Sequence, residues 1–246
     1  MPALSVITVC YNAQRTILDA VKSVIESKPA DLEYIVVDGA STDGTVETLG
    51  PYAHRIDRII SEPDHGIYDA MSKGVAASTG RFIAFLNADD AYLPAALPLL
   101  LDAIAKCGDQ FDVVYGDWLG VGKNGSLFPR KASHRLDWKH RLCHQAMAVR
   151  RVFMLEPSGF DSRYRLCADF DLILRLRTVG ARFQYLPYNL VRFDESGASN
   201  TRVRRAAWES ILIAWRRIGL LRSFPFVLLT ALHALRSLGT DRANSK

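Results

Sequence analysis

The side chains best suited to chemistry in this sequence belong to two pairs of aspartates. Asp38 and Asp43 lie close together, and Asp89 and Asp90 are adjacent. Carboxylates gathered in one place repel one another unless a cation or hydrogen-bond donors neutralise them. A hard ion such as Mg²⁺ or Mn²⁺ takes few protein carboxylates and completes its coordination with phosphate oxygens. A turn residue at Asp38, or a helix cap at Asp89 and Asp90, is the plainer interpretation, and spacing alone leaves both open.

Two further positions have side chains that could take part in a reaction. Asp169 stands at the start of a predicted, otherwise apolar helix over 168–179. Partial burial there could raise its pKa and suit it to act as a general base, and the alternative is that it only caps the helix. Asp69 and Lys73 lie four apart on another predicted helix, where they either face a ligand or form a surface ion pair.

Strands and helices alternate along the first half of the chain. Apolar runs predict buried strands, and the apolar spacing after each run predicts a helix. The expected strands cover 4–10, 34–37, 58–61 and 81–86, and the expected helices cover 14–27, a segment after 44, 66–78 and 94–106. This alternation is typical of a parallel sheet with helices on both faces. Ligands bind beyond the carboxyl ends of such strands. We therefore expect one crevice to contain Asp38, Asp43, Asp89 and Asp90.

The second half of the chain has a less regular pattern. Asn124-Gly125 predicts a hairpin turn between strands over 113–120 and 126–130. Strands over 182–186 and 189–193 follow the helix at 168–179. From 202 to 238 we expect two amphipathic helices, with a break near Ser223-Phe224-Pro225.

The composition fits a globular α/β protein. Apolar residues make up 49% and charged residues 23% of the 246 residues, which argues against disorder. The four cysteines show no CxxC pairing, which predicts reduced thiols and a cytoplasmic location. We find no secretory signal over 1–9, and the longest apolar run, 223–235, is too short to span a bilayer.

Positive charge is concentrated in residues 201–246. This tail has nine Lys/Arg and two acids, a net charge of +7, whereas the rest of the chain has a net charge of −2. Trp208, Ile211, Leu212 and Trp215 recur at helical spacing and are flanked by arginines. Such a helix can lie peripherally on the inner membrane, or can pack on the core or on a dimer partner, and both interpretations stay open. Nucleic acid is not an expected partner, because no base-stacking or groove-reading motif accompanies the tail.

Six segments, taken in order, resemble family 2 glycosyltransferases, which have the GT-A fold. The segments are 5–12, 35–45, 62–74, 80–90, 143–146 and 159–175. The likeness covers residues 4–195 and is closest to the bacterial branch that builds surface polysaccharides and glycolipids. GxxxxGK[ST] is absent, which disfavours a P-loop kinase. GxGxxG occurs once, at 120–125, but within the predicted hairpin and not at a strand-to-helix turn, which disfavours a dinucleotide-dependent oxidoreductase.

The resemblance implies a role for each matched residue. Asp38 would contact the base, and the whole set expected around the donor is Thr8, Tyr11, Asn12, Asp38, Ser41, Asp43, Asp69, Lys73, Asn87 and Ala88. Asp89 would bind the metal with support from Asp90, and Asn87 stands where many members carry Asp. The residues expected near the acceptor or the diphosphate are His144, Gln145 and Arg175, and Asp169 matches the catalytic base.

The resemblance therefore implies an inverting, metal-dependent glycosyltransferase. A divalent cation, Mn²⁺ or Mg²⁺, would stabilise the leaving diphosphate, and Asp169 would take the proton of the acceptor hydroxyl. The donor would be a nucleoside-diphosphate sugar, and the acceptor a glycan or lipid-linked glycan. The alternative is a nucleotide-sugar-binding protein without transfer activity, against which the intact Asp89 and Asp169 argue.

The expected domain organisation is a GT-A domain followed by a basic tail. The GT-A domain covers 1–200, with a nucleotide-binding half over 1–117 and an acceptor half over 118–200. The tail over 201–246 is expected to form amphipathic helices. The predicted fold class is thus α/β, with a mostly parallel central sheet flanked by helices.

Overall fold

The chain divides into two compact units. The computed structural model describes residues 1–122, 124–134, 142–155, 159–194, 202–219, 221 and 223–230. The first unit comprises Met1–His134, Arg141–Phe160 and Ala181–Glu195, and the second comprises Arg135–His140, Asp161–Gly180 and Ser196–Lys246.

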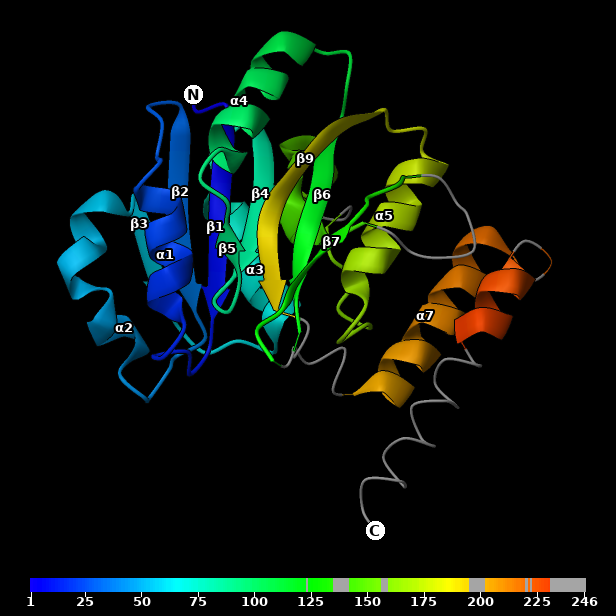
Figure 1. Ribbon diagram of the computed structural model, residues 1–246. Coiled ribbons are helices and arrows are strands. Elements are labelled where there is room, and N and C mark those ends of the chain that lie inside the picture. Colours follow the sequence, from blue (N-terminus) through cyan, green and yellow to red (C-terminus); the bar gives the residue numbers. More distant parts are fainter. Residues whose placement is uncertain are drawn as a thin grey trace. The chain divides into compact units, whose positions relative to one another are not determined.

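Within the described residues, nine strands of the first unit form one mixed sheet (Figure 1). The strands are β1 Leu4–Cys10, β2 Leu32–Asp38, β3 Arg58–Ser61, β4 Phe82–Asn87, β5 Ala91–Tyr92, β6 Val113–Val121, β7 Leu127–Arg130, β8 Met147–Arg150 and β9 Phe183–Asp194. Their order is β3-β2-β1-β4-β8-β6-β9-β5, with β7 paired to β6. Strands β1 to β4 run parallel, as the alternation of strands and helices predicted.

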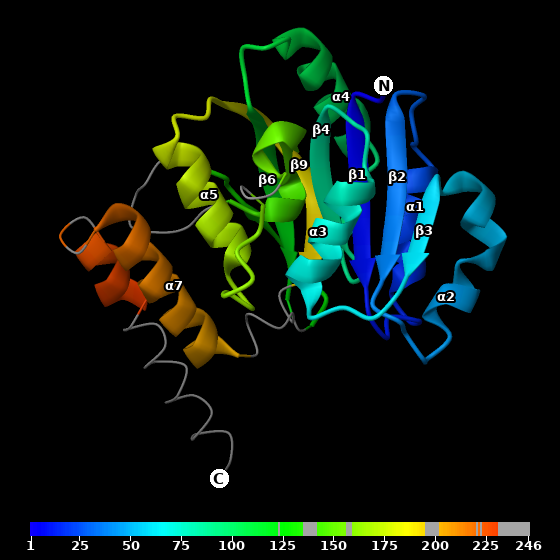
Figure 2. The ribbon, with the colours of Figure 1, turned by 180° about the vertical axis from the view of Figure 1, so that it is seen from behind.

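Helices cover both faces of this sheet. The helices of the first unit are α1 Ile17–Ile25, α2 Thr45–Thr48, α3 Ile67–Ala77 and α4 Ala96–Cys107, with 3₁₀ turns η1 Gly50–Arg55, η2 His144–Ala146 and η3 Arg151–Phe153. Figure 1 shows α1 and α4 on one face, and Figure 2 shows α3 on the other. Coverage on both faces explains why β1, β2 and β4 are nearly continuous apolar runs.

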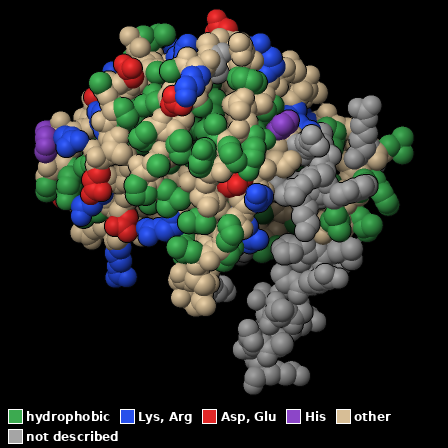
Figure 3. Space-filling view, turned by 45° about the horizontal axis from the view of Figure 1, so that its top comes forward, with side chains coloured by type: hydrophobic (Ala, Val, Ile, Leu, Met, Phe, Trp, Pro, Cys, Tyr) green, Lys and Arg blue, Asp and Glu red, His purple; other side chains and the backbone are tan. Residues whose placement is uncertain are grey.

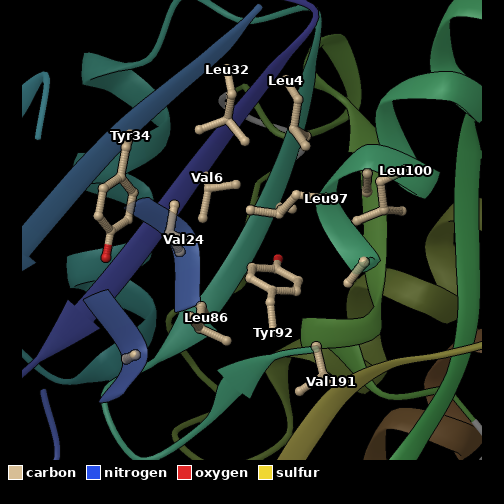
Figure 4. Close-up of a cluster of buried hydrophobic side chains, with 14 of the residues drawn as sticks. Leu4, Val6, Val24, Leu32, Tyr34, Leu86, Tyr92, Leu97, Leu100 and Val191 are labelled. Atoms are coloured by element: carbon tan, nitrogen blue, oxygen red, sulfur yellow. The ribbon is translucent and has the colours of Figure 1, made fainter. Parts of the chain in front are cut away.

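The larger hydrophobic core lies between the sheet and helices α1 and α4 (Figure 4). Leu4 and Val6 of β1 pack there with Leu97 of α4. Ile7 points to the opposite face, because successive residues of a strand alternate. On that face a Cβ at Gly74 of α3 would lie 2.4 Å from the Ile7 side chain. Glycine therefore lets α3 pack closely against β1.

The predicted hairpin is confirmed. Strands β6 and β7 pair antiparallel, from Trp118 opposite Arg130 to Val121 opposite Leu127. Gly125 in the turn has φ 76°, a left-handed conformation that glycine adopts without strain. Lys123 of this turn lies outside the described residues.

The sheet differs from the prediction in three places. Strand β8 lies between β4 and β6 and is antiparallel to both, and neither β8 nor the short β5 was expected from the sequence. The segments 182–186 and 189–193, expected as two strands, form the single strand β9. The pairing of β9 with β6 shifts register at Asp117, where Leu186 is followed by Asn189. That shift accommodates Pro187, which has no N–H to donate to the ladder.

The second unit contains two packed helices, α5 Ala168–Thr178 and α7 Val203–Ile218. The break expected near Ser223-Phe224-Pro225 is wrong. Helix α7 ends at Gly219, which has φ 79° and so adopts a conformation that commonly terminates helices. Residues 223–230 are helical, and the end expected near 238 lies outside the described residues.

The domain boundary expected at residue 200 stays a prediction, and the second unit contains residues from before it as well as after it. Helix α5 belongs with α7, so the segment after 201 forms part of a unit that begins earlier in the chain. No helix among the described residues is long and apolar enough to cross a membrane.

Candidate active site

Asp38 ends β2 and anchors the loop that follows it. Its side chain is fully buried. Its Oδ2 accepts hydrogen bonds from Ser41 N at 3.0 Å and from Ser61 Oγ at 2.7 Å, and its Oδ1 accepts one from Ser41 Oγ. Contact between Asp38 and the base stays a prediction. In this structure Asp38 fixes the positions of Ser41 and Ser61.

The loops that follow β1 and β2 are tied together by hydrogen bonds. Asn12 N donates to Ser41 Oγ at 2.8 Å, and Thr42 N donates to Asn12 Oδ1 at 3.0 Å. Asn12 has φ 48°, a left-handed conformation that asparagine tolerates better than most residues. A third bond runs from Ala13 N to Thr45 Oγ1 at 2.8 Å. We call these two joined loops, residues 11–14 and 39–45, the nucleotide platform.

Asp43 completes the nucleotide platform. Its Oδ1 accepts hydrogen bonds from Thr45 N at 3.0 Å and Thr45 Oγ1 at 2.5 Å, and its Oδ2 accepts one from Gln14 N at 3.0 Å. The bond from the Thr45 side chain, followed by those from the two backbone amides, lowers the pKa of Asp43 below its usual value. Unlike Asp38, Asp43 is exposed, so an ionised carboxylate remains open to solvent here.

Gly39 leaves room for two side chains beside the platform. A Cβ at this position would lie 2.4 Å from Asp64 Oδ2 and 3.3 Å from the ring of Tyr11. Tyr11 is 65% exposed, which leaves its ring open to stack on a planar ligand. Asp64 had no distinguishing signal in the sequence beyond its place shortly after β3. It joins the platform because the parallel register brings the end of β3 beside that of β2.

Asp69 and Lys73 hold the segment between β3 and α3. Lys73 Nζ lies 3.7 Å from Asp69 Oδ2 and 3.1 Å from Glu62 Oε1, and donates to Pro63 O at 2.6 Å. Asp69 Oδ2 accepts a hydrogen bond from His65 N at 3.0 Å. Desolvation opposes the charge on Lys73, but the neighbouring carboxylates outweigh it and raise the pKa of the ammonium. The ion-pair interpretation is confirmed, and contact with the donor stays a prediction.

The segment after β4 places its two aspartates in different environments. Asp89 has an exposed side chain, whereas Asp90 is buried. Gln145 Nε2 donates to Asp90 Oδ2 at 2.6 Å, and Asp194 N donates to Asp90 Oδ1 at 2.8 Å. Both carboxylate oxygens of Asp90 are thus engaged by protein donors. The role of Asp90 at the metal, direct or supporting, stays a prediction.

Three residues expected to contact ligands face the interior instead. Gln145 is fully buried, and its Oε1 accepts a hydrogen bond from Cys143 Sγ at 3.1 Å. Thr8 is fully buried in the middle of the sheet, where its hydroxyl and that of Tyr34 are 3.0 Å apart. Ala88 is also buried. The ligand contacts expected for Gln145, Thr8 and Ala88 stay predictions, and in this structure all three side chains are buried.

Asp89 and Asp90 both have raised pKa values. Desolvation by the surrounding protein is the main cause for each. The charge of Asp194 further raises the pKa of Asp89, whereas His144 lowers it. The charge of Asp89 further raises the pKa of Asp90. A bound cation would relieve the repulsion between these carboxylates, so positive charge beside Asp89 and Asp90 would stabilise their ionised forms.

Asn87 contributes an oxygen to the same edge of the sheet. Its Oδ1 is buried, and no donor among the described residues reaches it. Across β1, Val9 lies opposite Asn87 and Cys10 lies opposite Asp38. Two strand spacings separate β2 from β4, which is roughly 10 Å. The carboxyl ends of β2 and β4 therefore meet at one edge, although no cluster of three His, Cys, Asp or Glu suited to a metal occurs among the described residues.

Asp169 lies in the second unit, in the first turn of α5. Two residues later, Asp171 is fully buried and accepts hydrogen bonds from Arg175 Nε at 2.8 Å and Arg217 Nε at 2.7 Å. Arg175 therefore holds an acid in this structure, and its expected place near the acceptor or the diphosphate stays a prediction.

Glu209 of α7 fixes the start of α5. Its Oε2 accepts hydrogen bonds from Leu166 N at 2.8 Å and Cys167 N at 3.2 Å, and its Oε1 accepts one from Arg205 Nε at 3.2 Å. The side chain of the N-cap residue Cys167 makes no capping bond. Glu209 thus accepts hydrogen bonds from two backbone amides directly before the helix that contains Asp169. Sequence reasoning missed it, because no local pattern joins residues that lie 42 apart.

Comparison with known proteins identifies the family. A model described as Glycosyl transferase family 2 matches residues 5–158. The chain belongs to this family. It is therefore a glycosyltransferase, as the six ordered segments predicted.

A relative of similar length is named for a role in a bacterial glycan pathway. The chain is 30% identical over 241 residues to a PGL/p-HBAD biosynthesis glycosyltransferase of Mycobacterium bovis, with 94% of each chain covered. That agrees with the branch of family 2 that the sequence resembles.

Two solved structures establish the fold. One is S. aureus TarS in complex with UDP-GlcNAc, with a TM-score of 0.67 and 16% identity over 94% of this chain and 72% of that one. The other is the mannosyltransferase PcManGT of Pyrobaculum calidifontis in complex with GDP-Man and Mn²⁺, with a TM-score of 0.68 and 18% identity over 97% and 75%. The family 2 chain has the GT-A fold expected from its sequence, with a mixed, mostly parallel sheet flanked by helices.

Proposed function

We propose that this family 2 glycosyltransferase is inverting and metal-dependent, and that it transfers a sugar from a nucleoside diphosphate to a glycan or lipid-linked glycan. The observation that carries the proposal is the edge of the sheet at which the nucleotide platform and the exposed Asp89 follow neighbouring parallel strands. Ligands of parallel sheets bind at this edge.

The nucleotide platform suits the base and ribose of the donor. Tyr11 presents an aromatic face, and the exposed carboxylate of Asp43 can accept hydrogen bonds from ribose hydroxyls. Asn12 and Ser41 hold these loops in place before any ligand arrives, which lowers the entropy cost of binding. The UDP-GlcNAc and GDP-Man complexes of the two structural neighbours support a nucleotide-sugar donor and make uridine and guanosine the first bases to test.

Asp89 and Asn87 fit a divalent cation. Asp89 offers an exposed carboxylate, and Asn87 offers a buried Oδ1 to which no described residue donates. Carboxylate and amide oxygens are the ligands that Mg²⁺ and Mn²⁺ prefer, with diphosphate oxygens completing the shell. When bound, the ion neutralises charge on the leaving diphosphate. Mn²⁺ in the complex of PcManGT supports this assignment.

Asp169 is the proposed base of the reaction. The acceptor O–H gives its proton to the Asp169 carboxylate while its oxygen forms the new bond to the anomeric carbon. The bond from that carbon to the diphosphate breaks with both electrons leaving on the diphosphate. One such in-line displacement inverts the anomeric centre, so an α-linked donor gives a β-linked product.

Replacing Asp169 tests this assignment directly. We expect Asp169→Asn to lower kcat by roughly 10²- to 10⁴-fold, because the amide cannot accept the proton. Donor binding, measured by thermal shift, should be unchanged. Asp161→Asn in the same unit is the matched control and should keep most activity. Turnover of Asp169→Asn at the wild-type rate would show that another group is the base.

The names of two relatives support the proposed acceptor class. PGL/p-HBAD biosynthesis is the printed role of the relative from Mycobacterium bovis, and a chondroitin synthase of Pasteurella multocida is 29% identical over 195 residues. Both names support a bacterial glycolipid or surface polysaccharide as the acceptor. Product mapping by NMR would report the linkage and the anomeric configuration, and an α-linked product from an α-linked donor would contradict inversion.

A further inference from the structure

The outer face of α7 exposes two tryptophans. Trp208 is 62% exposed and Trp215 is 47% exposed. Residues seven apart lie two turns apart on the same side of a helix, and Ile211 lies between them. Arg204, one turn before Trp208, extends the same side. We call Arg204, Trp208, Ile211 and Trp215 the outer face of α7.

The opposite side of α7 packs against α5. Glu209 is buried against the start of α5, and Arg217 pairs with the buried Asp171 at 2.7 Å. Ile213 and Ala214 are buried on this side as well. A surface helix ordinarily turns its largest apolar side chains toward the protein and its charges toward water. Helix α7 instead directs buried ionic groups inward and both tryptophans outward, so its packing on α5 does not account for the tryptophans.

The exposed charge on α7 has a single sign. The acid within Val203–Ile218 is Glu209, which is buried, whereas Arg204, Arg205 and Arg216 are exposed. The left part of the surface drawn in Figure 3 differs, because Lys and Arg side chains are interspersed with Asp and Glu side chains there. Arginine beside tryptophan suits an anionic lipid surface, where the guanidinium pairs with phosphate and the indole ring lies at the level of the headgroups.

The same chemistry continues beyond Gly219. Leu221 is 92% exposed and Phe224 is 64% exposed, and Leu228 and Leu229 are exposed as well. Scattered exposed apolar residues are normal, but a succession of them in one short stretch of chain marks an interaction surface.

We propose that the outer face of α7 and the exposed apolar residues after Gly219 bind the surface of a membrane rich in anionic phospholipid. The helix lies along the surface, with Trp208 and Trp215 in the interface and the arginines on headgroup phosphates. Membrane binding requires neither the sugar donor nor sugar transfer, so its test is independent of the proposed function.

Vesicle sedimentation of the full chain tests the proposal. We expect binding to vesicles of phosphatidylcholine with phosphatidylglycerol, weaker binding as salt rises, and little binding to phosphatidylcholine alone. Trp208→Ser with Trp215→Ser should reduce binding by about tenfold or more, because the interfacial apolar surface is lost. Arg202 is exposed directly before α7. Arg202→Gln with Arg204→Gln should reduce binding by roughly an order of magnitude and flatten the salt dependence.

A matched control comes from the first unit. Tyr188 and Arg58 are exposed there, so Tyr188→Ser with Arg58→Gln should bind vesicles like wild type. Circular dichroism and thermal unfolding confirm that each variant is folded, and a variant that fails is replaced by Trp208→Gln alone. Equal binding by the tryptophan variant and wild type would overturn the proposal. A second result would also overturn it: wild type does not bind vesicles and is a dimer in sedimentation velocity, and the tryptophan substitutions dissociate that dimer. A second copy of the chain would then cover this face.

Discussion

At the residue scale, burial distinguishes aspartates that look equivalent in the sequence. Asp38 and Asp43 both follow β2, yet one is buried and the other exposed. Asp89 and Asp90 are neighbours, yet only Asp90 has both oxygens held by protein donors. A buried, satisfied carboxylate shapes a loop, whereas an exposed one can meet a ligand.

The lowered pKa of Asp43 predicts a pH dependence of stability. Because its usual pKa of 3.8 is lowered in the folded state, Asp43 stabilises the fold fully above that value and loses this contribution as the pH falls through the folded pKa. We expect wild type to have a higher Tm than Asp43→Asn from pH 7 to about 5, and the difference to close in stronger acid. Asp31→Asn, an exposed change before β2, is the control. A difference in Tm that grew on acidification would contradict the assignment.

At the element scale, long-range hydrogen bonds fix the ends of strands and helices. Gln145 on η2 and the end of β9 both bind Asp90, and thereby secure the turn that carries Asp89. Glu209 does the same for the start of α5. Each bond satisfies backbone or side-chain donors that would otherwise be left without partners.

Removing the Glu209 carboxylate should loosen the start of α5. We expect Glu209→Ala to destabilise this region by about 2–3 kcal/mol, because two backbone amides lose their acceptor. Glu209→Gln keeps an oxygen for those amides, and Arg205→Gln removes only a half-exposed partner, so each should cost less than about 1 kcal/mol. Amide hydrogen exchange at Leu166 and Cys167 measures the effect. Unchanged protection in Glu209→Ala would show that α7 does not hold this end of α5.

At the scale of the whole molecule, the residues proposed for the reaction fall in two compact units. The nucleotide platform and Asp89 belong to the first unit, and Asp169 belongs to the second. The tail, predicted as an appendage, supplies α7 to the second unit. Truncation after residue 200 would therefore remove Glu209 together with the outer face of α7, so point substitutions are the sounder test of either.

Ligand-induced stabilisation of the whole chain tests the donor and the metal together. A donor at about 100 times its Kd should stabilise the native state by about 2.7 kcal/mol, which a thermal shift detects. We expect a UDP-sugar or GDP-sugar to raise the Tm, and Mn²⁺ to enlarge the shift. In Asp89→Asn the enlargement by Mn²⁺ should disappear while a smaller shift without metal remains. An undiminished effect of Mn²⁺ in that variant would place the ion elsewhere.

The sequence alone determined the family, the GT-A fold and the positions of most helices and strands. These depend on local periodicity and on glycine and asparagine at turns, which neighbouring residues encode. Tertiary structure alone decided which matched residues reach the surface. Thr8, Gln145 and Ala88 are buried, and Asp90 is held by Gln145 from 55 positions away, because packing and register join segments that no sequence spacing relates. The same holds for β8, for Glu209 and for the side of α7 that faces outward.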